Sequence, residues 1–497
     1  MISSTKKFAL ILFKGTIAST IVTSTTQIIG IILLPVFTYY LSPEDYGIVS
    51  IVSMIGLVLS HITNPGILTA TTRLYHDTDD INERKLLIGS TNVYFMSVAL
   101  IPIIIGLLFG PKLFSWLFKD FSFYPYGFLA LILTFIRQPA RIWITLMNLQ
   151  YKFHQATIYN GLALITGIAV SVILVVVFEM GAMGKVLGMF PSAIILVLIS
   201  LITVHRYTNG IWSFQNIKKQ FLFGLPILGA LWSTQILELG GAYMLERLTN
   251  MKSVGLFALA MSLAQLPLVL IYGFRQMWNP VIYENMNKKN YQTITKLLYY
   301  FVGTLTLINI LILLFGKEAI LIIVNERFYD SISFLGFLIL GVYFNGLITI
   351  SNSILGYKKK FGTISVFALV GSILYVIMCI FLIPRIGVLG AAISFAFSYF
   401  VFFILGVIHQ RKTILKIIKN LNLLIPIILF ISLSFITYFF SFYFPFDELS
   451  FLEITLKFIL LITSIFLLFY FKIFLKEDIA VTYKLVINKL TKNKFSS

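Results

Sequence analysis

The chain has 497 residues, of which 59% are hydrophobic and only 11% are charged. Soluble domains contain roughly 45–50% apolar and about 25% charged residues, so the composition excludes a water-soluble globule and, through its high hydrophobicity, a disordered chain. Long apolar runs recur from end to end, whereas a β-barrel would show short alternating segments. The sequence therefore predicts an all-α polytopic membrane protein.

The formal net charge of +19 would point to a nucleic-acid partner in a soluble protein. In a membrane protein, basic residues collect in the cytoplasmic loops, so we expect no nucleic acid here. The single cysteine, Cys379, excludes a disulfide within the chain and a Cys-based metal site. The basic stretch 1–14 leads into a long apolar run without a small-residue cleavage site, which indicates a retained first span.

A spanning helix needs about 20 mostly apolar residues, and the sequence contains about fourteen such runs. Their predicted centres, in chain order, are 16–40, 46–72, 86–109, 124–147, 154–178, 185–204, 221–245, 253–283, 291–315, 331–355, 361–383, 387–408, 421–444 and 451–471. With both termini inside, Lys and Arg residues on the inner side outnumber those on the outer side by about three to one. This bias favours an even number of spans and an N-in, C-in topology.

Similar junctions recur at nearly constant offsets. Gly181 to Gly184 matches Gly387 to Gly390, and Tyr151 matches Tyr357, both at an offset of 206; Gly47 matches Gly255 at 208. We infer an internal repeat of two six-helix lobes in parallel orientation, a pattern of transporters that handle substrate between the lobes. The predicted division is 1–210 for the N-terminal lobe, 211–420 for the C-terminal lobe, and 421–497 for two extra spans with a basic cytoplasmic tail.

Two arginines lie deep in the fourth predicted span. Arg137 falls about 20 Å from the outer end at 1.5 Å per residue, and Arg141 lies one turn further on the same face. Pro139 between them is expected to kink the helix and free a carbonyl. Charged side chains at this depth usually face a cavity or a partner, and two guanidinium groups make a fork for a phosphate or diphosphate. Hydrogen bonds to neighbouring carbonyls, with Arg141 reaching the inner surface, are the alternative.

Four further residues are candidates with weaker grounds. Glu238, midway along the seventh span, would pair with an arginine or take up a coupling Na⁺ or H⁺, unless it is a protonated carboxyl that is merely tolerated. Arg275 and Arg73 lie near the inner ends of their spans, where lining a vestibule and snorkelling to the surface are both open. His61 precedes Asn64-Pro65-Gly66, so a kink there is expected and a role in proton transfer stays open.

Motifs of several enzyme classes are missing from the sequence. It contains no Walker-A loop, no H-E-x-x-H, no Cys/His cluster and no nucleophile–base pattern. We therefore expect a protein that is not an enzyme, with no cofactor and no bound metal, and driven by an ion gradient, the membrane potential or downstream consumption.

Several junctions resemble bacterial polysaccharide-repeat flippases. They are Ile29–Gly47, Thr72–Tyr75, Phe223–Pro226, Trp278–Glu284 and, above all, Leu382–Ala392. This resemblance, which runs from about Phe8 to Val407, implies the multidrug/oligosaccharidyl-lipid/polysaccharide exporter superfamily, whose two lobes form a V and alternate between inward and outward states. Such flippases often carry an Asp-Arg pair in the seventh span, but the corresponding positions here are Gly241 and Ala242.

The expectation is therefore a flippase in the cytoplasmic membrane for an isoprenoid-diphosphate-linked oligosaccharide such as an O-antigen or capsule repeat, with membrane lipids and a coupling Na⁺ or H⁺ as further partners. A drug/cation antiporter or a cell-wall precursor flippase of the same superfamily is an alternative. A membrane glycan polymerase or ligase, from a different class, would normally need a large outer catalytic loop, and the longest one predicted, around 316–330, is short.

Overall fold

The computed structural model describes residues 29–224, 228–417, 422, 424–443, 450–471 and 473, and all regular elements in these ranges are helices. In the first part of the chain they are α2 (Leu34–Tyr40), α3 (Pro43–Ile62), α4 (Ile67–Asp77), α5 (Ile81–Leu117), η1 (Phe123–Gly127), α6 (Phe128–Leu149), α7 (Phe153–Val172), η2 (Ile173–Val177), α8 (Gly181–Leu187), α9 (Met189–Thr208) and α10 (Phe214–Gly224). The second part contains α11 (Leu228–Leu248), α12 (Met251–Ala264), α13 (Leu268–Asn287), α14 (Tyr291–Ile323), η4 (Glu326–Ser331), α15 (Ile332–Tyr357), α16 (Phe361–Ile386), α17 (Val388–His409), α18 (Arg411–Ile417), α19 (Leu424–Tyr443) and α20 (Phe451–Tyr470).

Ten helical stretches within the described residues are long and apolar enough to cross a membrane, and the helices 251–264 and 424–438 are shorter but also apolar. The chain is thus a multi-pass helical membrane protein. Most of the first expected span, 16–40, lies outside the described residues. The number of fourteen spans and the N-in, C-in topology stay predictions.

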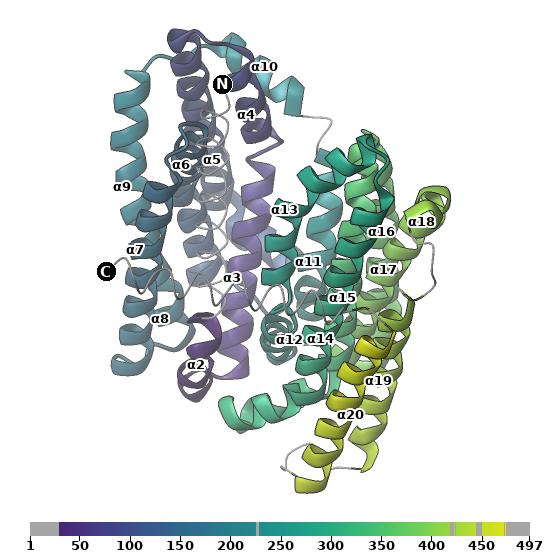
Figure 1. Cartoon of the computed structure of the whole chain (residues 1–497). Helices are drawn as coiled ribbons and strands as arrows, with labels where there is room; N and C mark the ends of the chain where they lie inside the picture. The colour runs from purple at the N-terminus through teal and green to yellow at the C-terminus, as the bar shows by residue number, and fades with distance from the viewer. Residues whose placement is uncertain are drawn as a thin grey trace, which may run out of the picture.

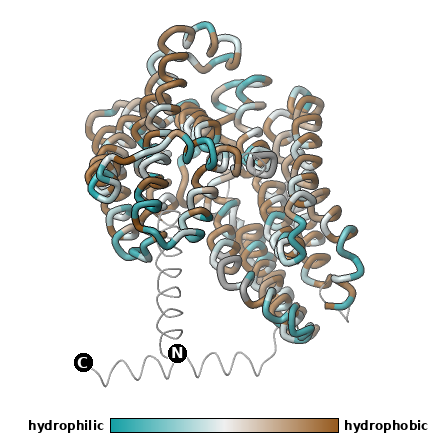
Figure 2. The backbone as a smooth tube through the Cα atoms, turned by 90° about the horizontal axis from the view of Figure 1, so that it is seen from above, coloured by the Kyte–Doolittle hydropathy of each residue, from teal (hydrophilic) through white to brown (hydrophobic). Residues whose placement is uncertain are grey.

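The helices gather into two groups. Figure 1 places α2 to α9 on one side and α11 to α20 on the other, and the view from above separates the same two groups (Figure 2). Hydrophobic residues run along the helices of both. Helix α3 begins at Pro43 at the lower end in Figure 1, which we call the Gly47 end, and leads to α4 at the opposite end, which we call the Arg73 end.

Local chemistry explains where α3 begins and ends. Ser42 and Asp45 form a capping box, in which each side chain accepts the other residue's backbone N–H, and Pro43 occupies the first turn. The helix ends at Ile62 before Asn64-Pro65-Gly66, and Gly66 takes a left-handed φ of 76°. The interruption of the predicted span 46–72 is confirmed, because a proline and a left-handed glycine together cannot continue an α-helix.

The repeat-related glycines Gly47 and Gly255 meet where α3 crosses α12. A Cβ on Gly255 would lie 1.8 Å from the Pro43 carbonyl oxygen, and one on Gly47 would lie 2.3 Å from that of Met251. The two backbones therefore touch, and any side chain at either glycine would force the helices apart. The crossing joins the two groups of helices at the Gly47 end.

Other repeat positions also share a conformation. Gly181 and Gly387 both have positive φ, 56° and 59°. The match of Tyr151 to Tyr357 is wrong by two residues, because the left-handed residues are Tyr151 and Lys359, an offset of 208. The offset falls to 206 at the glycines, and the two additional residues of the first repeat fall in the stretch that contains the π-helical turn η2.

The buried side chains form two large clusters. The larger extends through α11 to α19 and includes residues of α3, α5 and α6 from the Gly47 end, such as Ile51, Phe114 and Leu131. The other lies at the Arg73 end, and all its members fall between Ile67 and Tyr207. The two groups of helices thus share a hydrophobic core at the Gly47 end, while the first group has a core of its own at the Arg73 end.

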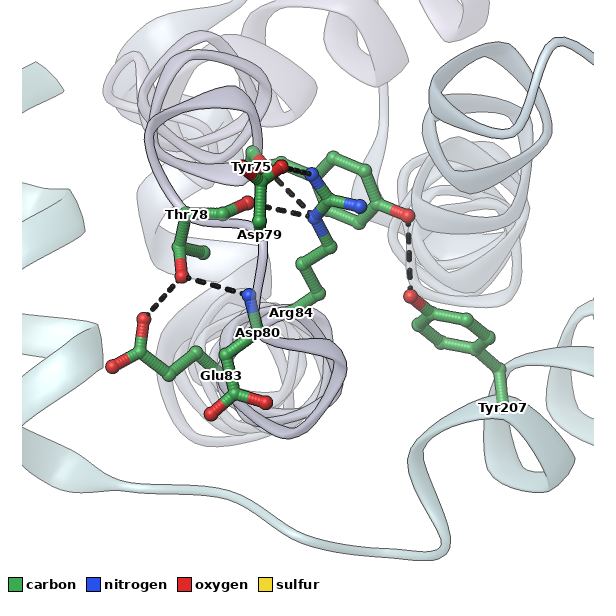
Figure 3. A network of polar contacts seen from close by, with 7 residues as sticks. All are labelled: Tyr75, Thr78, Asp79, Asp80, Glu83, Arg84 and Tyr207. Atoms are coloured by element: carbon green, nitrogen blue, oxygen red, sulfur yellow. Dashed lines mark hydrogen bonds and ion pairs between the residues drawn. The ribbon is translucent and has the colours of Figure 1, made fainter.

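The turn between α4 and α5 is stabilised by Arg84 (Figure 3). Its Nε donates to the carbonyl oxygens of Tyr75 and Thr78 at 3.2 and 2.9 Å, and an NH₂ group lies 3.1 Å from Asp79. The guanidinium stands over the Tyr75 ring, whose hydroxyl pairs with that of Tyr207 on α9 at 3.2 Å. This network links α4, α5 and α9 at the Arg73 end.

Helix α10 packs against α4 and α5, although the predicted division put residues 211–224 with the C-terminal lobe. The buried Gln220 amide donates to the hydroxyls of Thr71 and Thr91 and to the Leu87 carbonyl, at 2.9 to 3.3 Å. Gly224 lies against Gly66, since a Cβ on Gly66 would lie 2.6 Å from the Gly224 carbonyl oxygen. The described part of the connection between the two groups is therefore bound to the first group.

The prediction of an outer loop at 316–330 is wrong. Helix α14 continues to Ile323, and η4 follows directly. Lys317 and Glu318 are charged, but both are buried in ion pairs with α20 (Lys317 to Glu453 at 2.7 Å, Glu318 to Lys457 at 2.6 Å). Pairing offsets the cost of burying charge, which lets the helix extend through this stretch.

Candidate functional site

Arg137 and Arg141 lie one turn apart on α6, at mid-length. Leu131 is the last residue of this helix in the core shared by both groups, and Ile142 is the first in the core of the Arg73 end. The Arg137 side chain is exposed and that of Arg141 is half-buried. The two guanidinium groups thus lie at the depth where the shared core gives way to a core of the first group alone.

Polar contacts to α3 and α9 fix this part of α6. Arg141 Nη1 donates to the Ser60 carbonyl oxygen at 3.4 Å, and the Gln138 amide donates to the Thr63 hydroxyl at 2.8 Å. Helix α6 continues through Pro139, whose carbonyl accepts the Ser200 hydroxyl at 2.5 Å. The arginine face is therefore held beside α3, which is also the helix that packs against α11 and α12 of the second group.

Glu238 lies midway along α11 with an exposed side chain, in electrostatic range of Tyr399 on α17. Three residues on, Gly241 stands against Tyr375, since a Cβ there would lie 2.3 Å from the phenolic oxygen. Tyr375 thus fills the space beside Gly241, one of the two positions where the resemblance implied an Asp-Arg pair. Glu238 lies about one turn earlier on the same helix.

Two of the remaining predicted residues, Arg73 and His61, make their described contacts within their own helices. Arg73 is exposed on α4 and pairs with Asp77 on the same helix at 3.5 Å. His61 Nδ1 lies 2.7 Å from the Leu57 carbonyl oxygen within the last turn of α3. The backbone of Arg275 belongs to α13, but its side chain lies outside the described residues. None of their predicted roles is tested by these contacts.

Lysines gather where α15 ends, at the Arg73 end. Burial, together with the neighbouring charges of Lys360 and Lys416, lowers the pKa of Lys358. Like charges near one another disfavour protonation, and Lys360 and Lys416 lie close enough to Lys358 for this effect.

Sequence reasoning missed two groups of charged residues at the Gly47 end. One is Glu246 in the last turn of α11, which is fully buried. The other is the set of Lys317, Glu318, Glu453 and Lys457, which we call the ion quartet. Each residue stands near a predicted span end, where a charge ordinarily faces water, and only the spacing of Glu453 and Lys457 by four residues on one helix face hinted at pairing.

Solved structures share this two-group fold. The chain aligns with the lipid II flippase MurJ in an inward closed conformation at a TM-score of 0.64 and 15% identity, covering 96% of this chain and 100% of that one. An inward-facing multidrug resistance MATE family transporter of the MOP superfamily aligns at 0.59 and 15% identity, over 80% of this chain and 96% of the other. A MOP superfamily transporter from Pyrococcus furiosus aligns at 0.54 and 16% identity, over 82% and 96%.

These structural similarities show that the chain is a multi-pass membrane protein with the fold seen in MOP-superfamily transporters. No curated protein sequence matches the chain. The family model described as polysaccharide biosynthesis protein matches residues 12–286, more than half of the chain. The chain therefore belongs to the polysaccharide biosynthesis protein family, as the resemblance found in the sequence implied.

Proposed function

We propose that this protein is a flippase that carries an isoprenoid-diphosphate-linked oligosaccharide across the cytoplasmic membrane for assembly of a surface polysaccharide such as an O-antigen or capsule. The proposal rests on one observation above all: Arg137 and Arg141 lie on one face at mid-length of α6, beside the helix that contacts the second group. Planar guanidinium groups bind phosphate oxygens through paired hydrogen bonds. Two of them suit a diphosphate.

Membership in the polysaccharide biosynthesis family supports a glycan cargo, and the MurJ-like and MATE-like fold supports transport rather than catalysis. In the proposed mechanism the head group enters from the Arg73 end and is screened by Arg137 and Arg141, while the lipid tail stays in the bilayer. The two lobes then rock, so that the Arg73 end closes and the Gly47 end opens.

The bias of Lys and Arg residues supports assigning the Arg73 end to the cytoplasm. The shared hydrophobic core at the Gly47 end supports assigning this conformation to the outward-closed state. We infer that Glu238 takes up the coupling H⁺ or Na⁺, with His61 as a second candidate, and that Arg73 and Arg275 attract the anionic head group at the entrance.

The test is flipping of a fluorescent lipid-linked oligosaccharide in proteoliposomes. We expect Arg137→Ala to slow flipping at least tenfold, because a hydrogen bond to a charged group contributes about 1.5–3 kcal/mol. Arg385→Ala is the matched control, since this arginine is exposed at the end of α16. Unchanged flipping by the double variant Arg137→Ala/Arg141→Ala would remove the proposed diphosphate site.

A second candidate cargo is a cell-wall precursor, which the whole-chain likeness to the lipid II flippase structure favours. Lipid II carries the same diphosphate, so Arg137 would serve both. Competition in the same proteoliposomes decides between them, because the true cargo displaces the other. A drug/cation antiporter is the remaining candidate within this fold, and it would transport an organic cation faster after Arg137→Ala rather than slower, since a positive charge would be gone.

A further inference from the structure

Glu246 is bound by the opposite group of helices. Its side chain is 0% exposed, and Oε1 accepts the backbone N–H groups of Lys119, Asp120 and Phe121 at 2.8, 2.7 and 3.1 Å. These three amides belong to the turn between α5 and η1, more than 120 residues away in sequence. A single carboxylate oxygen thus holds three consecutive amides of the other group.

Further contacts surround this one. The Lys119 ammonium donates to the Thr249 carbonyl oxygen at 2.7 Å, directly after α11. The crossing of Gly47 and Gly255 joins the same two groups at this end, and the backbone N–H of Asn325 reaches the Thr38 hydroxyl at 3.3 Å. Glu246 is the charged member of this set that is fully buried.

The chemistry of the contact favours reversible opening. Hydrogen bonds from N–H groups to a carboxylate are roughly twice as strong as neutral ones, so they stabilise the closed arrangement. Their partners are backbone amides rather than an opposite charge, and water replaces such donors when the two groups separate. The second oxygen, Oε2, is buried and has no hydrogen-bond partner among the described residues. In the closed state this oxygen has therefore lost its hydrogen bonds to water and gained none from these residues.

We propose that Glu246 is a clasp for the Gly47 end: its carboxylate holds the turn at residues 119–121 while this end is closed and releases it when the end opens. The inference rests on the proposed alternating access, whose outward-closed state the clasp stabilises. It assigns Glu246 a positioning role in transport, remote from the arginines that bind the head group.

The experiment measures opening without any substrate. Met251, which contacts Gly47 and is 8% exposed, is replaced by cysteine in a Cys379→Ala background, and the protein is placed in nanodiscs. The rate of labelling by a hydrophilic maleimide then reports how often the Gly47 end opens. We expect Glu246→Gln to raise this rate about tenfold, because three charge-assisted hydrogen bonds become neutral. Lys119→Ala, which removes the exposed ammonium, raises it about threefold.

Glu326→Gln is the matched control, an exposed acid at the same end, and its labelling rate stays that of the parent. Glu246→Ala should label at least as fast as Glu246→Gln; if it does not yield a folded protein, Glu246→Gln alone decides. A labelling rate of Glu246→Gln equal to that of the parent overturns the clasp. Faster labelling in a protein that flips no lipid-linked oligosaccharide keeps the clasp and refutes the proposed cargo instead.

Discussion

Two regions at the Gly47 end bury charge in different ways. The ion quartet joins α14 to α20 through two ion pairs of 2.6 and 2.7 Å, and a third pair of 2.7 Å connects Glu453 and Lys457 within α20; the side chains are only 4 to 11% exposed. Two lysines neutralise two glutamates there. Glu246 instead lies alone among backbone amides of the opposite group. The charges of the ion quartet sum to zero. The carboxylate of Glu246 is stabilised by backbone N–H dipoles, and water molecules can take the place of these donors.

The difference matches what each contact joins. The quartet binds α20 to α14 within the second group of helices, so separation of these two helices would expose four desolvated charges at once. Glu246 spans the boundary between the two groups, where the proposed cycle requires separation. We therefore expect the junction with paired charges to stay closed through the proposed cycle and the junction held by backbone N–H groups to open.

The largest effect is expected from breaking the quartet. Lys457→Met leaves Glu318 and Glu453 without their shared partner, although Lys317 still pairs with Glu453. Breaking a buried pair costs about 3–5 kcal/mol. Thermal unfolding in detergent measures the loss, and Lys112→Met, at an exposed lysine of the same end, leaves the unfolding temperature unchanged.

A double variant sharpens the comparison. In Lys457→Met/Glu318→Gln the pair of Lys317 and Glu453 remains neutral by itself, so most of the stability returns. Among the residues that the structure describes, Glu246 has no such partner, since its donors are backbone groups. If the double variant is no more stable than Lys457→Met alone, mutual neutralisation is not what stabilises this junction.

The next effect is expected at the glycine crossing. Gly255→Ala places a methyl group 1.8 Å from the Pro43 carbonyl oxygen, which forces α3 and α12 apart. Overpacking costs about 1–3 kcal/mol, and here it falls on the closed state alone. The distance between spin labels at positions 112 and 252 should shift to longer values in at least half of the molecules. Gly161→Ala is the control, since nothing lies within 4 Å of its added Cβ, and an unchanged distance in Gly255→Ala would show that the crossing is not a boundary of motion.

Much of the fold was predictable because apolar length and turn chemistry are local properties. Pro65 and Gly66 predicted the break between α3 and α4, and the recurring glycines predicted positions that share a conformation in the two repeats. The register was wrong by two residues at Tyr151, because the π-helical turn η2 changes the spacing without any glycine or proline to mark it.

The candidate site was predictable only in part. The depth of Arg137 and Arg141 follows from counting residues along a span, and the structure places them at mid-length of α6. The ion quartet and Glu246 did not follow from the sequence, because their partners lie more than 120 residues away. A charge near the end of an apolar run is usually solvated, and only tertiary packing distinguishes a buried one.

The smallest effect is expected at Arg84, a cation that donates to the backbone carbonyl oxygens of Tyr75 and Thr78 and also pairs with the exposed Asp79 (Figure 3). Its side chain is 25% exposed, and the contacts stay within one hairpin of the first group. Arg84→Gln should lower the free energy of unfolding by about 1 kcal/mol, because partial hydration replaces much of what is lost. Labelling at position 251 should not change, since no boundary between the groups is touched. Faster labelling in Arg84→Gln would mean that loss of a charge bound by backbone groups affects opening even far from the boundary between the two groups. The effect of Glu246→Gln would then not be specific to the Gly47 end.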